Sequence, residues 1–199
     1  MKFHALCIAT LMASSSFGAS AAELSYNYLE LDLERATVDA GGEDFDDSDD
    51  VDFDGLRFRV SGSFTNHVYG FAHFARRVND DYDADIDLEE FEVGLGAHFA
   101  LAESTDALIE LAGQRLAVEV LDENASTKGL RTSVGVQSAF NDRFSGIVKA
   151  NYFDGSDYDG EFGGTVGAQV KLNKTWGAVG EVEFAEDIRQ FRLGLRASF

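Results

Sequence analysis

Apolar and polar residues alternate along most of this chain. The last eleven residues show it most clearly: Phe191, Leu193, Leu195, Ala197 and Phe199 are apolar, and the residues between them are polar or small. A period of two places successive side chains on opposite faces of a β-strand. One face of this terminal strand is therefore apolar, and the other carries arginines.

The same alternation recurs in segments of about ten residues that are separated by turn-forming residues. It predicts ten strands, with eight as the alternative count, over residues 24–34, 55–65, 68–78, 89–100, 106–120, 129–140, 143–153, 162–172, 175–184 and 189–199. Two segments are ambiguous. In 68–78 we place Tyr69 and Phe71 outward and Arg76 inward, and in 106–120 a change of phase near residues 113–116 suggests a bulge.

The connections alternate in length. Residues 65–67, 101–105, 141–142 and 173–174 read as short turns, whereas 36–54, 79–87, 121–128 and 154–161 read as longer acidic loops. Short periplasmic turns and longer outer loops are typical of bacterial outer-membrane barrels. The sequence thus predicts an all-β fold, a transmembrane antiparallel up-and-down β-barrel.

Aromatic residues support this prediction over a soluble β-sandwich, whose strands also alternate. Those beside the short turns fall on the face assigned to lipid and would form a girdle at one membrane interface. They are Phe64, Tyr69, Phe99, Phe140, Phe144, Trp176 and Phe199.

The amino-terminal residues have the pattern of a secretory signal peptide. Lys2 is followed by an apolar run and by small residues up to Ala22, so we expect residues 1–22 to be removed and residues 23–199 to form the barrel. Cys7, the only cysteine, lies in the signal, which leaves the mature chain without a disulfide or a cysteine metal site.

Composition narrows the possible partners. The formal net charge is −20, which argues against nucleic-acid binding through phosphate neutralisation. Seventeen Phe argue against disorder, and the absence of Pro suits a chain made mostly of paired strands.

On this evidence the chain resembles small bacterial outer-membrane β-barrel proteins of the OmpA and OmpX kind. The resemblance rests on the signal, the alternating strands, the short turns and the terminal Phe199. It implies an outer-membrane location and insertion through the carboxyl-terminal strand, in which Phe199 is the recognition signal. It also implies a monomeric barrel in contact with lipid and lipopolysaccharide. Because no linker follows the last predicted strand, we expect the chain to be a barrel without an added periplasmic domain. Eight strands are usual for this kind of barrel.

Charged residues of both signs fall on the inward face. The expected lumen network comprises Glu30, Asp32, Arg57, Arg59, Glu90, Glu92, Arg131, Glu181, Glu183, Arg192 and Arg196. Opposite charges in a confined interior tend to pair, and a barrel of about ten strands is close to the size that side chains fill. We favour a lumen closed by ion pairs. A narrow porin-like channel for ions or small solutes is the alternative.

Alternate aspartates in the first long loop, Asp50, Asp52 and Asp54, match the start of a calcium-binding loop. An EF-hand is excluded because its twelfth position is Ser61. Weak binding of Ca²⁺ or Mg²⁺, which would bridge these carboxylates to lipopolysaccharide phosphates, is one hypothesis, and a simply solvated acidic surface is the other. No other cofactor is expected.

The sequence offers little for catalysis. His67 and His98 fall near short turns and His73 falls within a strand, so none is placed at an outer rim beside a serine or aspartate. We therefore expect no enzymatic activity, and a structural or surface-interaction role that includes membrane integrity, lipopolysaccharide contact or adhesion.

Overall fold

The computed structural model describes residues 24–39, 50–79, 86–120, 123–156, 160–186 and 188–199. The expected signal peptide and the acidic stretches 80–85 and 157–159 lie outside this part of the chain. Ten strands are present: β1 (Tyr28–Asp39), β2 (Asp50–Ser63), β3 (Val68–Asn79), β4 (Ile86–Ala102), β5 (Thr105–Val120), β6 (Glu123–Ala139), β7 (Phe144–Gly155), β8 (Glu161–Lys171), β9 (Trp176–Phe184) and β10 (Ile188–Ser198).

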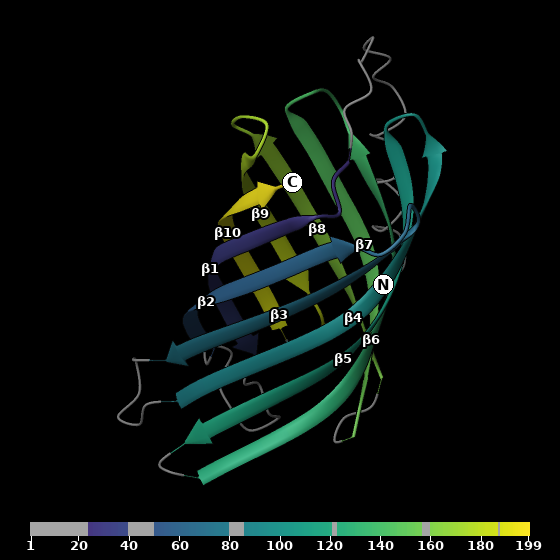
Figure 1. Cartoon of the computed structure of the whole chain (residues 1–199). Coiled ribbons are helices and arrows are strands. Elements are labelled where there is room, and N and C mark those ends of the chain that lie inside the picture. The colour runs from purple at the N-terminus through teal and green to yellow at the C-terminus, as the bar shows by residue number, and fades with distance from the viewer. Residues whose placement is uncertain (1–23, 40–49, 80–85, 121–122, 157–159, 187) are drawn as a thin grey trace, which may run out of the picture.

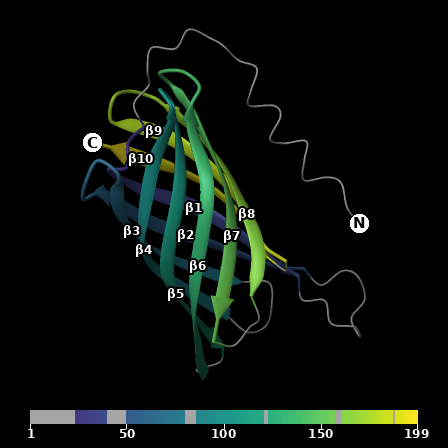
Figure 2. The same cartoon turned by 90° about the vertical axis from the view of Figure 1, so that its right-hand side faces the viewer.

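The ten strands form one closed barrel (Figure 1). Each strand pairs antiparallel with its sequence neighbours, and β10 pairs with β1 to close the sheet. The fold class and the count of ten are therefore confirmed, and the alternative of eight strands is wrong. Figure 2 shows the tilt of the strands in the wall, and β5 and β6 reach furthest at the end that carries the long loops, the loop end.

The alternating sequence explains why the wall is built this way. Apolar residues point outward and remain exposed, as Leu31, Leu95 and Leu193 do with exposures of 55–66 %. Charged and polar residues point inward and are buried. A closed barrel satisfies every backbone group of its strands, so such a wall can face lipid. Among the described residues no helix is long and apolar enough to cross a membrane.

Aromatic side chains encircle the wall at both edges of its apolar band. Six of the seven predicted girdle residues are exposed at the short-turn end, namely Phe64, Phe99, Phe140, Phe144, Trp176 and Phe199. A second girdle, which we did not predict, lies toward the loop end and comprises Phe91, Tyr152, Phe162, Phe184 and Phe191. Phe91 and Phe99 lie on one strand, so a rise of about 3.4 Å per residue and a tilt of about 40° put the girdles about 20 Å apart.

The predicted phase of β3 is wrong. Tyr69 and Phe71 point into the barrel, each 4 % exposed, together with His73 and Arg77, whereas Arg76 is exposed on the outer surface. Tyr69 therefore does not belong to the girdle. Aromatic and charged residues occur on both faces of this strand, so its alternation alone does not reveal which face is inside.

The predicted bulge in β5 is also wrong. The register of β5 with both neighbours is continuous across residues 113–116, and the irregularity of the β4–β5 pair lies at Ala100 and Ala102. The continuous register keeps residues 113, 115, 117 and 119 on the outer face, where Arg115 and Glu119 are charged. The apparent change of phase marks the edge of the apolar band.

Several loops are shorter than predicted because the strands continue past the apolar band. β1 and β2 stay paired as far as Asp39 and Asp50, inside the predicted 36–54 loop, and β6 begins at Glu123. At the other end β1 begins at Tyr28 and not at residue 24. Residues 24–27 instead turn into the barrel, where Tyr26 is 7 % exposed.

Candidate functional site

The charged lumen is the candidate functional site. All eleven residues of the expected network point inward from strands β1, β2, β4, β6, β9 and β10. The pairing of neighbouring strands sets acids beside bases, since Glu30 lies opposite Arg59 and Arg196, and Arg192 lies opposite Glu181.

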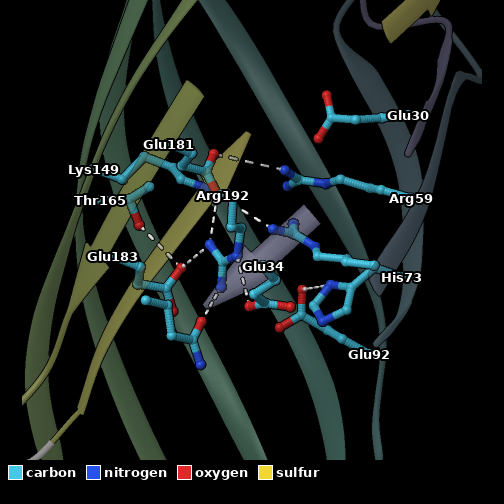
Figure 3. A network of polar contacts seen from close by, with 12 residues as sticks. Glu30, Glu34, Arg59, His73, Glu92, Lys149, Thr165, Glu181, Glu183 and Arg192 are labelled. Carbon is cyan, nitrogen blue, oxygen red and sulfur yellow. Dashed lines mark hydrogen bonds and ion pairs between the residues drawn. The ribbon is translucent and has the colours of Figure 1, made fainter. Parts of the chain in front are cut away.

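Arg192 is the most connected cation of the lumen. Its guanidinium donates to Glu181 at 2.6 Å, to Glu183 at 3.1 Å and to Glu34 at 3.0 Å, and it also contacts Gln190. These partners lie on the two strands that flank β10 and on β10 itself. Arg192 therefore ties β1, β9 and β10 together from the inside, as Figure 3 shows.

The contacts continue from Glu34 toward β3 and β4. Glu34 accepts from Arg77 at 2.9 Å, and Arg77 also donates to Glu90 at 2.6 Å. Glu90 contacts Nε2 of His73 at 2.9 Å, and the other ring nitrogen of His73 lies 3.4 Å from Glu92. His73 is thus held between two carboxylates.

The contacts return across the lumen through Arg131 on β6. Arg131 donates to Glu92 at 2.5 Å and lies 3.8 Å from Glu183, which contacts Arg192. The circuit is thereby closed. We call these eight groups the charge belt: Arg192, Glu183, Arg131, Glu92, His73, Glu90, Arg77 and Glu34.

Two features make the charge belt a strong link across the lumen. Its members alternate between carboxylates and nitrogen bases all the way round, and Glu92 is fully buried. A buried charge that loses its partner is costly, so each member holds its neighbours in place. The belt joins β1, β3, β4, β6, β9 and β10 across the lumen, which sheet pairing alone does not do.

A second set of ion pairs lies nearer the short-turn end. Arg57 and Arg59 approach Glu181 at 3.4 and 3.9 Å. Arg196 donates to Glu30 at 2.5 Å, and its guanidinium lies 4.0 Å from the centre of the Tyr28 ring.

Glu110 and Lys149 form a further pair at 3.0 Å, and the Tyr69 hydroxyl donates to Glu110 at 2.8 Å. Asp32 differs from the other lumen acids because no ion pair joins it to a described residue and its Oδ2 has no hydrogen-bond partner. It lines a cavity of about 50 Å³ beside Glu30 and Lys149, which has room for a few water molecules.

An aromatic cluster lies inside the barrel at the short-turn end. Tyr26 stacks on Tyr69 at 4.8 Å and on His98 at 4.0 Å, and its hydroxyl donates to Asp106 at 2.7 Å. Burial, together with the Asp106 carboxylate, raises the pKa of Tyr26 above its usual value, so the hydroxyl remains a donor. Tyr26 lines both the small cavity and a mouth of about 670 Å³ at this end.

The three aspartates of the cation hypothesis do not form a loop cluster. Asp52 and Asp54 belong to β2, where Asp52 accepts from Thr37 and Asp54 pairs with Arg35 at 2.6 Å. Asp50 also belongs to β2, but its side chain lies outside the described part of the structure. No group of three or more metal-ligating side chains occurs among the residues described. Cation binding stays a prediction.

Sequence reasoning missed four important members of the lumen. Glu34 was on the predicted inward face but outside the expected network, while Arg77 and His73 were lost through the wrong phase of β3. Tyr26 was read as part of the first strand. Continuing the inward alternation of β3 back from Asn79 would have identified Arg77 and His73.

The described histidines form no evident catalytic pair. His73 belongs to the charge belt, His98 contacts Asp106 at 3.1 Å beneath Tyr26, and His67 lies in the turn between β2 and β3. The absence of enzymatic activity stays an expectation.

Comparison with known proteins gives the fold. No family model matches the sequence, and no curated protein matches it significantly. The NanC porin is 7% identical with a TM-score of 0.55, over 86% of this chain and 100% of that one. The β-domain of the Bordetella autotransporter BrkA is 13% identical with a TM-score of 0.50, over 89% and 100%. The narrower resemblance to OmpA and OmpX stays a prediction. The chain has the fold of an outer-membrane β-barrel protein.

Proposed function

We propose that this chain is an outer-membrane barrel with a closed lumen and a structural or surface-interaction role. That role comprises support of the membrane and contact with lipopolysaccharide, through its phosphates or through bridging divalent cations, and it extends to adhesion. In this orientation the short turns face the periplasm and the loop end faces outward. The charge belt, which links Arg192 back to itself through seven partners, is the observation that carries the proposal.

The energetics of the charge belt favour a closed lumen. A conducting path would have to separate buried ion pairs, and removing one partner of such a pair costs about 3–5 kcal/mol. Ten-stranded barrels also lie near the size at which side chains fill the interior. The aromatic cluster around Tyr26 adds a second barrier at the short-turn end.

A narrow channel for ions or small solutes is the second candidate. The polar lining and the 670 Å³ mouth at the short-turn end favour it. The solved barrels with this fold include a porin and an autotransporter domain, so the fold by itself does not decide between the two functions.

Single-channel recording separates the candidates. We would insert the folded mature chain into planar bilayers, with and without calcium, and compare it with Glu183→Gln/Arg192→Gln, which removes opposite charges together. We expect silence from the unmodified chain and steps from the variant. Arg189→Gln, an exposed change on the same strand, should stay silent. Steady steps from the unmodified chain would establish the channel and reject the closed lumen.

A further inference from the structure

Two cations face each other on the outer surface of the wall, and no ion pair joins either of them to a described residue. Arg115 on β5 lies directly opposite Lys128 on β6, and both are exposed. Among the described residues, the outward acids nearest by register are Glu89, two residues from the partner of Arg115, and Asp154, which lies opposite a residue two positions from Lys128. No ion pair joins either acid to Arg115 or Lys128. Like charges directly opposite in a sheet repel, so an anion bound between them would relieve a standing cost.

Two other outward arginines near this edge of the band, Arg35 and Arg76, each have a carboxylate partner. Arg35 pairs with Asp54 at 2.6 Å, and Arg76 pairs with Asp87 at 2.9 Å. In a chain with a net charge of −20, carboxylates to neutralise a rim cation are plentiful. The Arg115–Lys128 pair is left open all the same, which points to an anion from outside the chain.

The surroundings of the pair match the head and tail of a lipid. Arg115 lies opposite Phe91 of the loop-end girdle, so the cations lie at the membrane interface. Gly113 lies two residues from Arg115 toward the centre of the apolar band, and its partners on the neighbouring strands are Val93 and Leu130. A Cβ at Gly113 would meet nothing within 4 Å. The outer face therefore carries no side chain directly below the charges, and we call this bare position at Gly113, between Val93 and Leu130, the notch.

We propose that Arg115, Lys128 and the notch at Gly113 form a binding site for a phosphorylated lipid of the outer leaflet. The phosphate lies between the two cations, where it accepts charge-assisted hydrogen bonds, and an acyl chain lies along Gly113. This site rests on the proposed contact with lipopolysaccharide and gives it a location. A direct contact of this kind needs no bridging metal ion.

Native mass spectrometry of the folded mature chain in detergent tests the site. The probes are bisphosphorylated lipid A, the same lipid with both phosphates removed, and inorganic phosphate as a competitor. We expect Arg115→Ala/Lys128→Ala to bind lipid A about tenfold more weakly. Arg35→Ala/Arg76→Ala, which removes two paired rim cations, should change binding less than about twofold. Gly113→Leu should weaken binding while leaving both charges in place.

The outcomes separate this site from the broader proposal. Equal binding by the unmodified chain and Arg115→Ala/Lys128→Ala would reject the site but keep the lipid contact. No binding of lipid A by the unmodified chain would reject both. Equal affinity for the dephosphorylated lipid would reject the role of phosphate, and displacement of lipid A by equimolar inorganic phosphate would reject the lipid as the ligand.

Discussion

At the scale of single residues, the lumen depends on buried charges that contact several partners at once. Arg192 is 7 % exposed and contacts three carboxylates from β1 and β9. Glycine at selected inward positions matters as much, because bulky neighbours lie over it. A Cβ at Gly96 would lie 2.2 Å from the Tyr69 ring, so the aromatic cluster needs glycine there.

Replacing Arg192 by Met should destabilise the barrel by about 3–5 kcal/mol, because Glu34, Glu181 and Glu183 would share a buried site with less compensation. The measurement is urea unfolding in lipid vesicles, followed by the fluorescence of Trp176. Arg189→Met on the same strand is the control and should change the free energy of unfolding by no more than about 0.5 kcal/mol. Similar losses in both variants would contradict the role of the charge belt.

Replacing Gly96 by Val should cost about 1–3 kcal/mol, because the Tyr69 ring must leave its place. Gly62→Ala is a matched control, since a Cβ there meets nothing within 4 Å and a strand glycine weakens its strand. The same unfolding measurement applies. A neutral Gly96→Val would show that the ring is not held against this position.

At the scale of elements, the segment before β1 packs against the inner surface of the barrel. The Ser61 hydroxyl donates to the Tyr26 carbonyl at 2.7 Å, and the Tyr26 ring stacks against β3 and β4. The segment adds no strand. It places the Tyr26 ring inside the barrel at the short-turn end.

The Tyr26 hydroxyl gives this element a pH dependence. Its pKa is raised in the folded chain, so its contribution is full below the unfolded value of about 10 and falls as the pH rises above that value. Tyr26→Phe should therefore lose less stability than the unmodified chain between about pH 9.5 and 11. Unfolding free energies at several pH values measure this. Parallel pH curves for the two chains would show that Tyr26 does not carry it.

At the scale of the whole molecule, pairing of β1 with β10 leaves no open edge among the described strands. A closed sheet opens only if many hydrogen bonds break together, and lumen contacts across the barrel resist the same motion. Contacts such as Arg131 with Glu183 join strands that are far apart around the wall.

Folded protein should therefore migrate differently from boiled protein on SDS gels and show β-rich circular dichroism in detergent. Glu183→Gln/Arg192→Gln should lose the folded band at a lower temperature, because two members of the charge belt are gone. The band intensity after heating to a series of temperatures measures this. Identical migration before and after boiling, together with little β-structure in detergent, would contradict the prediction that the chain folds into a closed barrel.

The sequence by itself determined the strands, their number, and most of the outward face. An apolar residue at every second position is a local signal. The outward face of the strands that contain Leu95 and Leu193 can therefore be read without knowing which strands lie beside them. The inward direction of Glu181 and Arg192 follows from the same alternation. Strand ends were harder to find, since pairs such as Arg35 with Asp54 extend the sheet in polar sequence.

Only the tertiary structure decided the phase of β3, the place of Tyr26 and the closure of the charge belt. The direction of β3 is set by its register with β2 and β4, which the mixed residues around His73 do not encode locally. Closure depends on how far the strands shift around the barrel, because that shift brings Arg131 of β6 to Glu183 of β9. Such contacts cross the lumen, and no spacing along the chain reveals them.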